Sequence, residues 1–586
     1  MKSMNPYRLV GALLTSLMLI TLSAVAAPGE PSLVKKRVLA DLDCIHNMFE
    51  VKYAPKPWKK EFAGWDLTQA IEDAKNKVES HPSPTLKECQ IILRDFFNST
   101  KDYHVGVRFF STESANLPFL VKGAESRYFV CYVDHEQSSG NDFPFEEGDE
   151  ILTFDNRPIH DVIDEIRIRE YGTNSIETDY ALAELSLTQR RGDMGNLVPS
   201  GNVEITGVKK GSNRKTSVTL TWDYTPEKIR DFSKIGKQID FQSCVKEDND
   251  QGLRNLLKKS QFFEKFMVAY LWDKSYLNSF SEMNKHALGA RSSFIPPLGR
   301  KIWKSGSDAI FDAYIFETSS GKKIGYIRLP HYVGDEEEVE EFGLTMNYFQ
   351  KKTEALIIDQ INNPGGSVFY LYALAATLTD NPLDTPKHHI AMTQEEVYIA
   401  NVLLPYLEQI KSDETARIVL GDTIGGYPVD YRFVRRMKQF CNFLITQWDA
   451  GKLFSDPTFL FGFDEIFPHP KFRYNKPILL LINSLDFSGG DFFPAILQDN
   501  KRATILGTRT AGAGGYVLST DFPNHSGMKG FVMTGSLAVR ADKRPIENLG
   551  IRPDIQYNLS VKDLQEDFKE YAATILETVE SLANRR

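Results

Sequence analysis

The chain has 586 residues, a formal net charge of −9 and 42% hydrophobic residues, values typical of a globular protein with several domains. The acidic balance argues against a nucleic-acid-binding protein, and the absence of low-complexity or heptad tracts excludes fibrous classes. Five widely spaced cysteines form no C-x-x-C pair and no H-E-x-x-H motif occurs, so we expect no metal site.

The N-terminus has the three parts of a secretory signal peptide. Lys2 and Arg8 precede an apolar stretch at 9–22, and small residues follow at 24–27. This order predicts cleavage after Ala26. The alternative is an uncleaved membrane anchor, but the apolar stretch is short for a span of about 20 residues. We therefore expect an exported protein with no stable membrane insertion after the signal is removed.

The next two regions differ in their predicted structure. Up to about residue 118 the pattern is mainly helical, with one apolar helical face at 86–97 and a short alternating strand at 105–109. From there to about 228, a β-rich run at 128–133 and a turn–strand–turn at 148–159 resemble part of a PDZ domain, in which a strand edge receives an extended peptide. The alternative is any β-hairpin with an Asp-Asn turn.

The C-terminal half alternates between predicted strands and helices. Apolar strands are expected at 324–329, 355–361, 477–483 and 503–507, and an amphipathic helix at 562–583 closes the chain. This order predicts an α/β layer with its functional sites at the carboxyl ends of the strands. The expected organisation is a signal peptide (1–26), a helical region (27–118), a PDZ-like module (119–228), a polar linker (229–291), an α/β core (292–560) and a C-terminal helix (561–586).

Two turns of the α/β core have the same design. Asn362-Asn363-Pro364-Gly365-Gly366 and Asp486-Phe487-Ser488-Gly489-Gly490 each follow an apolar strand and open a helix. Paired glycines allow close backbone approach, and a helix N-terminus presents free N–H groups that could bind a phosphate or an acyl-transfer oxyanion. Phosphate is less favoured, because neither turn has the lysine of a P-loop.

Ser488 distinguishes the second turn, because a hydroxyl at the end of a strand is well placed as a nucleophile. The sequence is not the G-x-S-x-G elbow of α/β-hydrolases, since Asp486 occupies the position of the first glycine. The alternative is a serine that only caps the following helix. Spacing alone does not select a base for Ser488 from the 11 histidines.

These motifs resemble the serine peptidases of the tail-specific (C-terminal processing) and tricorn type. The N-P-G-G turn, the serine turn and the T-R-T-A-G-A-G-G segment at 508–515 match that family over residues 322–556. Lys101-Asp102-Tyr103-His104 resembles its D-x-H segment, and Glu547-Asn548-Leu549-Gly550 also resembles a family motif. The resemblance implies an α/β core of the ClpP/crotonase type with an inserted PDZ-like module and an N-terminal helical region.

The family resemblance also implies the roles of five residues. Ser488 would be the nucleophile, His104 the general base and Glu547 the residue that supports the imidazolium; N–H groups of Gly489 and Gly366 (or Gly365) would form the oxyanion hole. No cofactor is implied. Many tail-specific relatives use a lysine about two dozen residues after the serine, but residues 511–515 contain none, which leaves histidine as the base.

A secreted member of the family suggests regulation and partners. There, an internal segment blocks the site of a zymogen, self-cleavage removes it, and the active form is a homodimer. By analogy, 232–290 would be inhibitory, with cuts near 247–250 and 275–291. We expect protein substrates, which could include host proteins if the chain is a virulence factor, and no nucleic acid. The alternatives are an inactive PDZ-containing scaffold and an esterase with the same triad.

Overall fold

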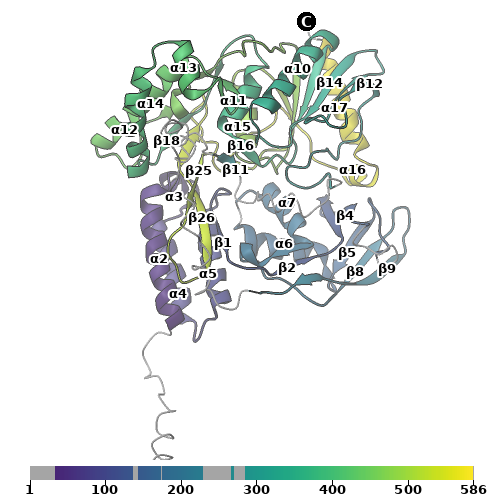
Figure 1. The fold of residues 1–586 in the computed structure, drawn as a ribbon. Helices are drawn as coiled ribbons and strands as arrows, with labels where there is room; N and C mark the ends of the chain where they lie inside the picture. The colour runs from purple at the N-terminus through teal and green to yellow at the C-terminus, as the bar shows by residue number, and fades with distance from the viewer. Residues whose placement is uncertain (1–32, 136–142, 173, 229–265, 269–283, 585–586) are drawn as a thin grey trace, which may run out of the picture.

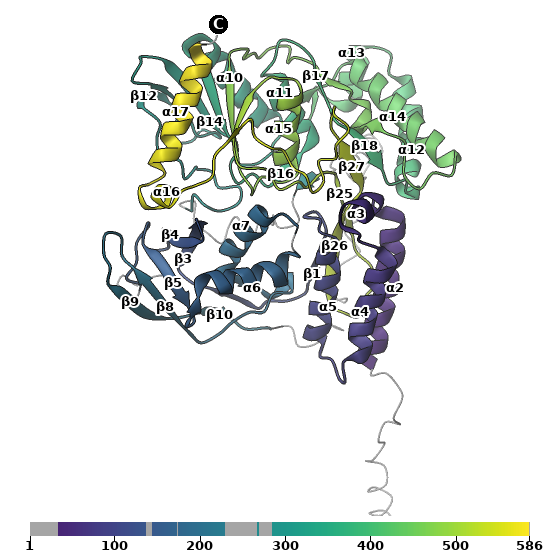
Figure 2. The ribbon, with the colours of Figure 1, turned by 180° about the vertical axis from the view of Figure 1, so that it is seen from behind.

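The protein consists of an α/β core above a helical region and a β module (Figures 1 and 2). The structure is a computed structural model, and it describes residues 33–135, 143–172, 174–228, 266–268 and 284–584. The predicted signal peptide and most of the predicted linker lie outside these residues. No helix among the described residues is long and apolar enough to cross a membrane.

A seven-stranded sheet forms the centre of the core, in the order β12-β13-β14-β15-β23-β24-β28. The strands are β12 (Arg300–Lys304), β13 (Ala313–Glu317), β14 (Lys323–Arg328), β15 (Ala355–Asp359), β23 (Ile478–Ile482), β24 (Thr504–Gly507) and β28 (Ile555–Gln556). Pairing is antiparallel from β12 to β14 and parallel from β14 onward. The carboxyl ends of β15 and β23 therefore meet at one edge, where both glycine turns follow.

Helices cover both faces of this sheet. One face packs against α10 (Glu336–Lys352), α11 (Val368–Ala376) and α15 (Gly489–Asp499), and the other against α17 (Lys569–Asn584). In β15, Leu356 and Ile358 point to the first face, whereas Ala355 and Ile357 point to the second. The period of two places every residue of the strand in a core, which explains its continuous apolar sequence.

The N-terminal helices pack on a β-extension of the core. They are α2 (Leu33–Lys52), α3 (Lys56–Ala63), α4 (Leu67–Ser80) and α5 (Leu86–Ser99). Strand β26 (Met528–Thr534) lies between β25 (Val517–Thr520) and β1 (Gly106–Phe109) in an antiparallel sheet. Phe531 of β26 contacts Phe49 and Phe97, with ring centroids 6.1 and 5.1 Å away. Strand β26, which comes from the C-terminal part of the chain, therefore packs against the N-terminal helices. It also pairs with β1, the strand that follows α5.

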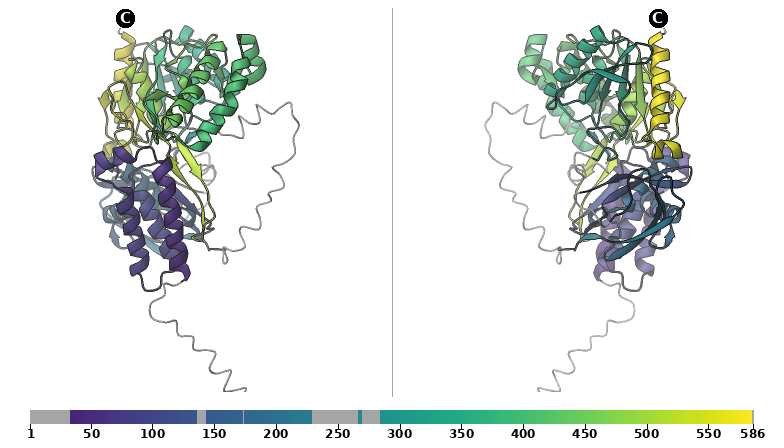
Figure 3. Two further views of the ribbon diagram at one scale, coloured as in Figure 1. Left: turned by 90° about the vertical axis from the view of Figure 1, so that its left-hand side faces the viewer. Right: turned by 90° about the vertical axis from the view of Figure 1, so that its right-hand side faces the viewer.

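The β module lies beside the N-terminal helices and beneath the core (Figure 3). Its sheet contains β3 (Phe119–Ala124), β4 (Arg127–Val133), β5 (Glu150–Phe154), β8 (Asn202–Val208) and β9 (Lys215–Thr221), with β6 (Arg157–Pro158) paired to β5. Two helices, α6 (Ile159–Tyr171) and α7 (Ile176–Leu187), accompany it, and β2 (Ser114–Asn116), β7 (Gln189–Arg191) and β10 (Asp223–Thr225) form a second small sheet. Arg94 and Asn98 of α5 donate hydrogen bonds to its backbone carbonyls.

The remaining elements form small sheets and a helical lobe. The lobe contains α12 (Gln394–Gln409), α13 (Asp413–Leu420) and α14 (Tyr431–Asp449). The short strands are β11 (Phe266–Val268), β16 (Gly365–Ser367), β17 (Leu383–Asp384), β18 (Lys387–Ile390), β19 (Thr423–Ile424), β20 (Tyr427–Pro428), β21 (Thr458–Phe459), β22 (Glu465–Ile466) and β27 (Ser536–Val539).

Two segments differ from the sequence prediction. The prediction of a single helix at 562–583 is wrong, because the segment is divided into α16 (Val561–Gln565) and α17. Between them, Asp567 and Phe568 adopt φ values of 56° and 55°, which an α-helix does not accommodate. Residues 284–290, which the prediction placed in the linker, are packed into the core. There the Asn362 backbone carbonyl accepts the Gly289 N–H (2.8 Å), and the Ala290 carbonyl accepts hydrogen bonds from Arg328.

Candidate active site

Ser488 lies at the junction between the central sheet and α15. Its φ of 57° and ψ of −112° place it in a region that L-residues rarely adopt, as in a strained strand-to-helix turn. The residue is fully buried, and its Oγ has no hydrogen-bond partner among the described residues. The Ser488 N–H donates to the Asp491 carboxylate (2.8 Å). The Asp491 N–H donates to the Ser488 backbone carbonyl (2.7 Å), which leaves the hydroxyl available for another use.

The two glycine turns touch each other beside Ser488. A β-carbon added at Gly489 would lie 3.2 Å from Gly366 N and 3.1 Å from Gly365 Cα. Gly366 itself has a φ of 155°, and a β-carbon there would lie 2.0 Å from the Tyr332 carbonyl oxygen, so only glycine fits. Gly489 is the first residue of α15, where backbone N–H groups have no partner within the helix. The backbones of both turns thus meet beside the residue that carries the hydroxyl.

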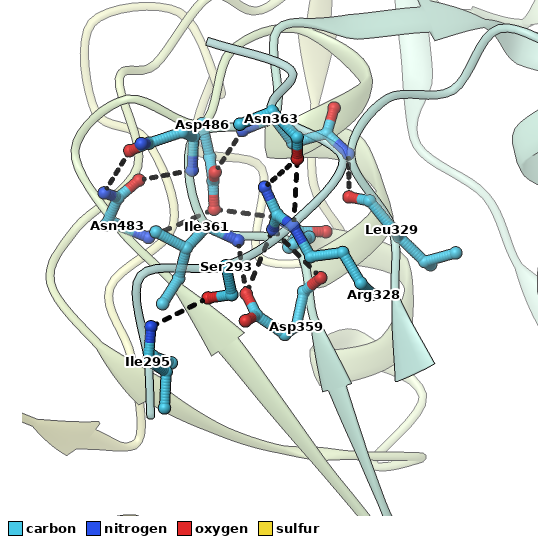
Figure 4. Close-up of polar contacts among 12 residues, drawn as sticks. Ser293, Ile295, Arg328, Leu329, Asp359, Ile361, Asn363, Asn483 and Asp486 are labelled. Atoms are coloured by element: carbon cyan, nitrogen blue, oxygen red, sulfur yellow. Dashed lines mark hydrogen bonds and ion pairs between the residues drawn. The ribbon is translucent and has the colours of Figure 1, made fainter. Parts of the chain in front are cut away.

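A buried polar network fixes the two turns to each other (Figure 4). Asn363 N donates to Asp486 Oδ1 (2.9 Å) and Asn483 N donates to Asp486 Oδ2 (3.1 Å), so one carboxylate joins both turns. Asn363 Nδ2 also donates to the Leu329 carbonyl (2.9 Å), which ties the first turn to the end of β14. Asp486, which replaces the first glycine of a nucleophile elbow, is therefore the residue that sets the spacing of the turns.

Below this network, an ion pair supports the strand ends. Arg328 Nη1 lies 3.1 Å from Asp359 Oδ1, and the same oxygen accepts the Ile361 N–H (3.0 Å). Both charged side chains are buried, and burial of a charge is tolerated only when it is paired and hydrogen-bonded. The ion pair therefore ties the end of β14 to the end of β15 beneath the turns.

His104 lies in the loop between α5 and β1. The neighbouring Tyr103 ring packs against the Phe487 ring, with centroids 5.5 Å apart, so this loop contacts the serine turn. His104 is fully buried, and both of its ring nitrogens lack a hydrogen-bond partner among the described residues. Unpaired buried polar atoms are costly and rare, so an unpaired imidazole and an unpaired hydroxyl beside the same turn indicate a functional site. Burial lowers the pKa of His104 to about 4, which keeps the ring neutral.

The Asp102 carboxylate organises the His104 loop. Its Oδ1 accepts the His104 N–H (2.9 Å), and its Oδ2 accepts the hydroxyls of Tyr53 (2.9 Å) and Thr534 (2.8 Å). Three segments of the chain, α2 with its C-terminal extension, the His104 loop and β26, therefore meet at one carboxylate.

Glu547 is brought to the same region from the C-terminal part of the chain. Glu547 is fully buried; its Oε2 accepts the Gly514 N–H (2.9 Å), and its Oε1 is ion-paired with Lys59 of α3. Burial raises the pKa of Glu547, the Asp102 charge adds to this increase, and Lys59 opposes it. No hydrogen bond between Glu547 and His104 is found among the described residues; the structure places them in one network through Lys59 and Asp102.

Asp491 connects the nucleophile to the Glu547 side. It accepts the N–H groups of Ser488, Gly512 (2.8 Å) and Ala513 (2.9 Å) and the Thr510 hydroxyl. Burial raises the pKa of Asp491 to about 6, and these hydrogen bonds oppose the increase. The glycine-rich segment that follows β24 is thus held between the serine turn and Glu547.

Sequence reasoning missed Lys59 and Asp491 as members of this region, and it assigned no contacts to Asp486, which it placed in the serine turn. Asp491 could have been found, because Ser488-x-x-Asp491 has the spacing of a serine followed by an acidic residue at a helix start. Nothing in the sequence distinguishes Lys59 from its neighbour Lys60. No group of three or more His, Cys, Asp or Glu side chains in the described part of the chain could hold a metal ion.

Comparison with known proteins agrees with this geometry. Residues 113–229 match the PDZ domain family and residues 323–557 match peptidase family S41. A protein of Chlamydia muridarum without an assigned function is 39% identical over 97% of both chains. The crystal structure of mature CPAF, the chlamydial protease-like activity factor, has 35% identity and a TM-score of 0.80, covering 94% of this chain and 98% of that chain. Mature CPAF complexed with lactacystin gives 35% identity and a TM-score of 0.79, covering 95% and 100%.

These matches and the strand-to-helix serine turn define a serine protease with an inserted PDZ domain. The chain belongs to peptidase family S41 and, within it, to the group of the chlamydial protease-like activity factor. The predicted fold class, an α/β peptidase core with an inserted PDZ module and an N-terminal helical region, is confirmed.

Proposed function

We propose that this protein is a secreted serine endopeptidase in which Ser488, His104 and Glu547 form the catalytic triad. The observation that carries the proposal is the buried Ser488 hydroxyl, which has no hydrogen-bond partner among the residues that the structure describes and is held by a strained backbone next to the contact between Gly489 and Gly366. His104 supplies the second unpaired polar group, from a loop that packs on the serine turn. No cofactor is needed for this chemistry.

In the first step, Ser488 Oγ attacks the carbonyl carbon of a peptide bond and His104 accepts the hydroxyl proton. The low pKa of His104 keeps it neutral and able to act as a base at neutral pH. The negative charge that forms on the carbonyl oxygen is stabilised by the N–H groups of Gly489 and Gly366. One such donor is worth about 3 to 4 kcal/mol in the barrier.

In the second step, the tetrahedral species collapses to an acyl-enzyme and His104 gives its proton to the leaving amine. Water then attacks the ester in the same way and releases Ser488. Glu547 supports the imidazolium that forms in each half-reaction. Burial disfavours the ionised form of Glu547, and the ion pair with Lys59 favours it.

We further propose that the chain is made as a zymogen that removes part of the predicted linker. Support comes from β11, which pairs antiparallel with β16: Met267 lies opposite Gly366 and Val268 opposite Gly365. A substrate that extends this edge as an added strand needs the same backbone groups. While β11 is paired there, the proposed oxyanion glycines are covered by the chain itself.

The packing of residues 284–290 narrows the position of the second cut. Asn284, Leu288 and Ala290 are buried, and the Asn362 side chain donates to the His286 carbonyl (3.0 Å). Proteolysis requires an exposed, extended segment, so we place the cut before residue 284. The first predicted cut zone, at 247–250, lies outside the described residues.

Export rests on the signal-peptide pattern at 1–26, whereas an active homodimer and host-protein substrates rest on the family resemblance; all three are proposals. The dimer is tested by measuring the molar mass of the processed enzyme in solution by light scattering. A monomer with full peptidase activity would refute it.

The decisive experiment compares three forms of the chain that begin at Ala27: the parent, Ser488→Ala, and Ser484→Ala, which changes a serine of the same turn outside the proposed triad. Each is incubated and analysed by intact mass, then with casein as substrate. Fragments from the parent and Ser484→Ala, with none from Ser488→Ala, are expected. Casein cleavage by Ser488→Ala at the parental rate contradicts the triad.

Casein digestion without self-cleavage would retain the endopeptidase and refute the zymogen. If none of the three forms cleaves either protein, the inactive scaffold becomes the better explanation. Turnover of small esters without peptide turnover would favour an esterase.

A further inference from the structure

We infer that Lys59, a residue of the N-terminal helix α3, is a positioning residue of the active site: its buried ammonium group favours the ionised form of Glu547 next to Asp102. This inference deepens the proposed function and rests on it, because it assumes that Glu547 supports His104. The comparisons assign no role to Lys59.

The three hydrogen bonds of the Lys59 side chain all go to oxygen acceptors. The side chain is fully buried, and its Nζ donates to Asn548 Oδ1 (2.9 Å) and to the Lys101 carbonyl (2.7 Å) as well as to Glu547 Oε1. An ammonium group has three donor protons, and three acceptors surround it. This set of acceptors matches the three donors of an ammonium group, so the geometry suits a partner of Glu547 and leaves the role of the base to His104.

Lys59 also separates two buried carboxylates. Its Nζ lies 4.0 Å from Asp102 Oδ2 on one side and is ion-paired with Glu547 on the other. The other titratable groups that face this cluster are Tyr53, which donates to Asp102, and the neutral His104. Without the cation, two buried negative charges would face each other, and one of them would take up a proton.

Protonation of Glu547 would remove the support of the imidazolium. Glu547 already has a raised pKa because of its burial and of Asp102, and Lys59 is the group that opposes this increase. Loss of the cation therefore moves the ionisation of Glu547 to higher pH. The rising, acidic limb of the kcat/KM profile reports groups that must lose a proton before catalysis, so it should move in the same direction.

The position of Lys59 couples the helical region to the catalytic site. The neighbouring Trp58 Nε1 donates to Asn548 Oδ1 (3.0 Å), and Asn548 Nδ2 donates to the Lys101 carbonyl (2.6 Å). Helix α3 therefore holds both the residue that follows Glu547 and the loop that carries His104. This explains why a helix far from Ser488 in sequence contains a fully buried charge.

The test is a pH profile of kcat/KM for peptide cleavage by the processed enzyme, measured for the parent, Lys59→Met and Lys60→Met. Lys60 belongs to the same helix but is exposed and paired with Asp66 (3.1 Å), so Lys60→Met should match the parent. For Lys59→Met we expect a loss of at least about tenfold at pH 7 and an upward shift of the acidic limb by about one pH unit or more. An unshifted limb overturns the inference.

A second variant covers the case in which Lys59→Met does not fold. Lys59→Arg keeps a cation at the site, so its acidic limb should stay at the parental position even if kcat falls because of the larger side chain. An upward shift in Lys59→Arg would contradict the inference. Failure of the proposed function is distinguishable, since it appears as peptide cleavage by Ser488→Ala, whatever the Lys59 variants do.

Discussion

The two halves of the active site are built in different ways. The nucleophile half, formed by the turns at 360–367 and 483–490, comes from two neighbouring parallel strands of one sheet. The base half, formed by Lys59, Asp102, His104 and Glu547, is assembled from segments separated by as many as 488 positions. The first half is therefore a local product of strand–turn–helix geometry, whereas the second exists only after the N-terminal helices have docked on the core.

The two halves also differ in their polar contacts. In the nucleophile half, Asp486 and Asn363 bond each other and the backbone of both turns, and within the described ranges Ser488 Oγ has no hydrogen-bond partner. In the base half, charge dominates: one buried cation contacts two buried carboxylates, and the nearby imidazole has no hydrogen-bond partner in the part of the chain that the structure describes. Changes to the first half should thus act through geometry, and changes to the second through protonation.

The largest effect is expected from His104→Asn, which removes the base and keeps a polar side chain of similar size. Loss of a triad histidine leaves only the contributions of the oxyanion hole and substrate binding, so kcat should fall by roughly 10⁴-fold or more. The measurement is steady-state cleavage of a peptide, with His46→Asn on α2 as the matched control. If both variants have similar rates, the base half is not where we place it.

The next largest effect is expected from Gly489→Ala, which changes the geometry of the nucleophile half without removing a functional group. In Gly489→Ala the new β-carbon would lie 3.0 Å from the Tyr332 ring and 3.2 Å from Gly366 N, so the turns must separate by a few tenths of an ångström. We expect kcat to fall about 10²-fold with little change in KM, as when one oxyanion donor is lost. The control is Gly306→Ala, because a β-carbon at Gly306 would approach no atom of the described residues beyond its chain neighbours more closely than Asp308 N, at 4.0 Å. Equal losses in kcat and in substrate affinity would point to general misfolding instead.

The same contrast explains what the sequence could predict. The strands of the nucleophile half are apolar because the sheet buries both faces, and glycine pairs after such strands are visible without a structure. Ser488, Gly366 and Gly489 could therefore be found as a turn pair from the residues alone. In the base half, His104 and Glu547 became candidates only through the family resemblance, since no local pattern relates residues so far apart in the chain.

Lys59 shows most clearly what could not be predicted from the sequence alone. It lies in a short helix with the sequence K-P-W-K-K-E-F-A, in which each lysine reads as an exposed residue. Only tertiary packing makes Lys59 fully buried while Lys60 stays in solvent. The division of the C-terminal helix at Asp567 and Phe568 was missed for a related reason: an apolar periodicity continues across two residues whose backbone leaves the helix.

A smaller effect is the pH dependence of the free energy of unfolding that His104 gives to the base half. The pKa of His104 is about 4 in the folded state because of burial, below the usual 6.5, so the unfolded chain binds a proton there more readily. Stability from this group is therefore present above pH 6.5 and lost as the pH falls toward 4. Between pH 7.5 and 5 the loss should be about 2 kcal/mol.

The pH effect is measured by urea unfolding in a Ser488→Ala background, which prevents self-digestion, with and without His104→Asn. The variant lacking His104 should lose about 2 kcal/mol less stability over this pH range than its parent. An identical pH dependence would mean that His104 is solvated and titrates normally.

The smallest effect concerns the helix that leads to His104. Thr85 caps α5: its hydroxyl accepts the Glu88 N–H (3.3 Å), and the Glu88 carboxylate accepts the Thr85 N–H (2.7 Å). Thr85→Ala should lower the free energy of unfolding by ~1 kcal/mol, whereas Thr68→Ala, in the exposed first turn of α4, should not. Because Phe97 and Phe531 fix the other end of α5, kcat at 25 °C should stay at the parental value. A fall in kcat would mean that the base half depends on the whole length of α5, not only on its packed C-terminal end.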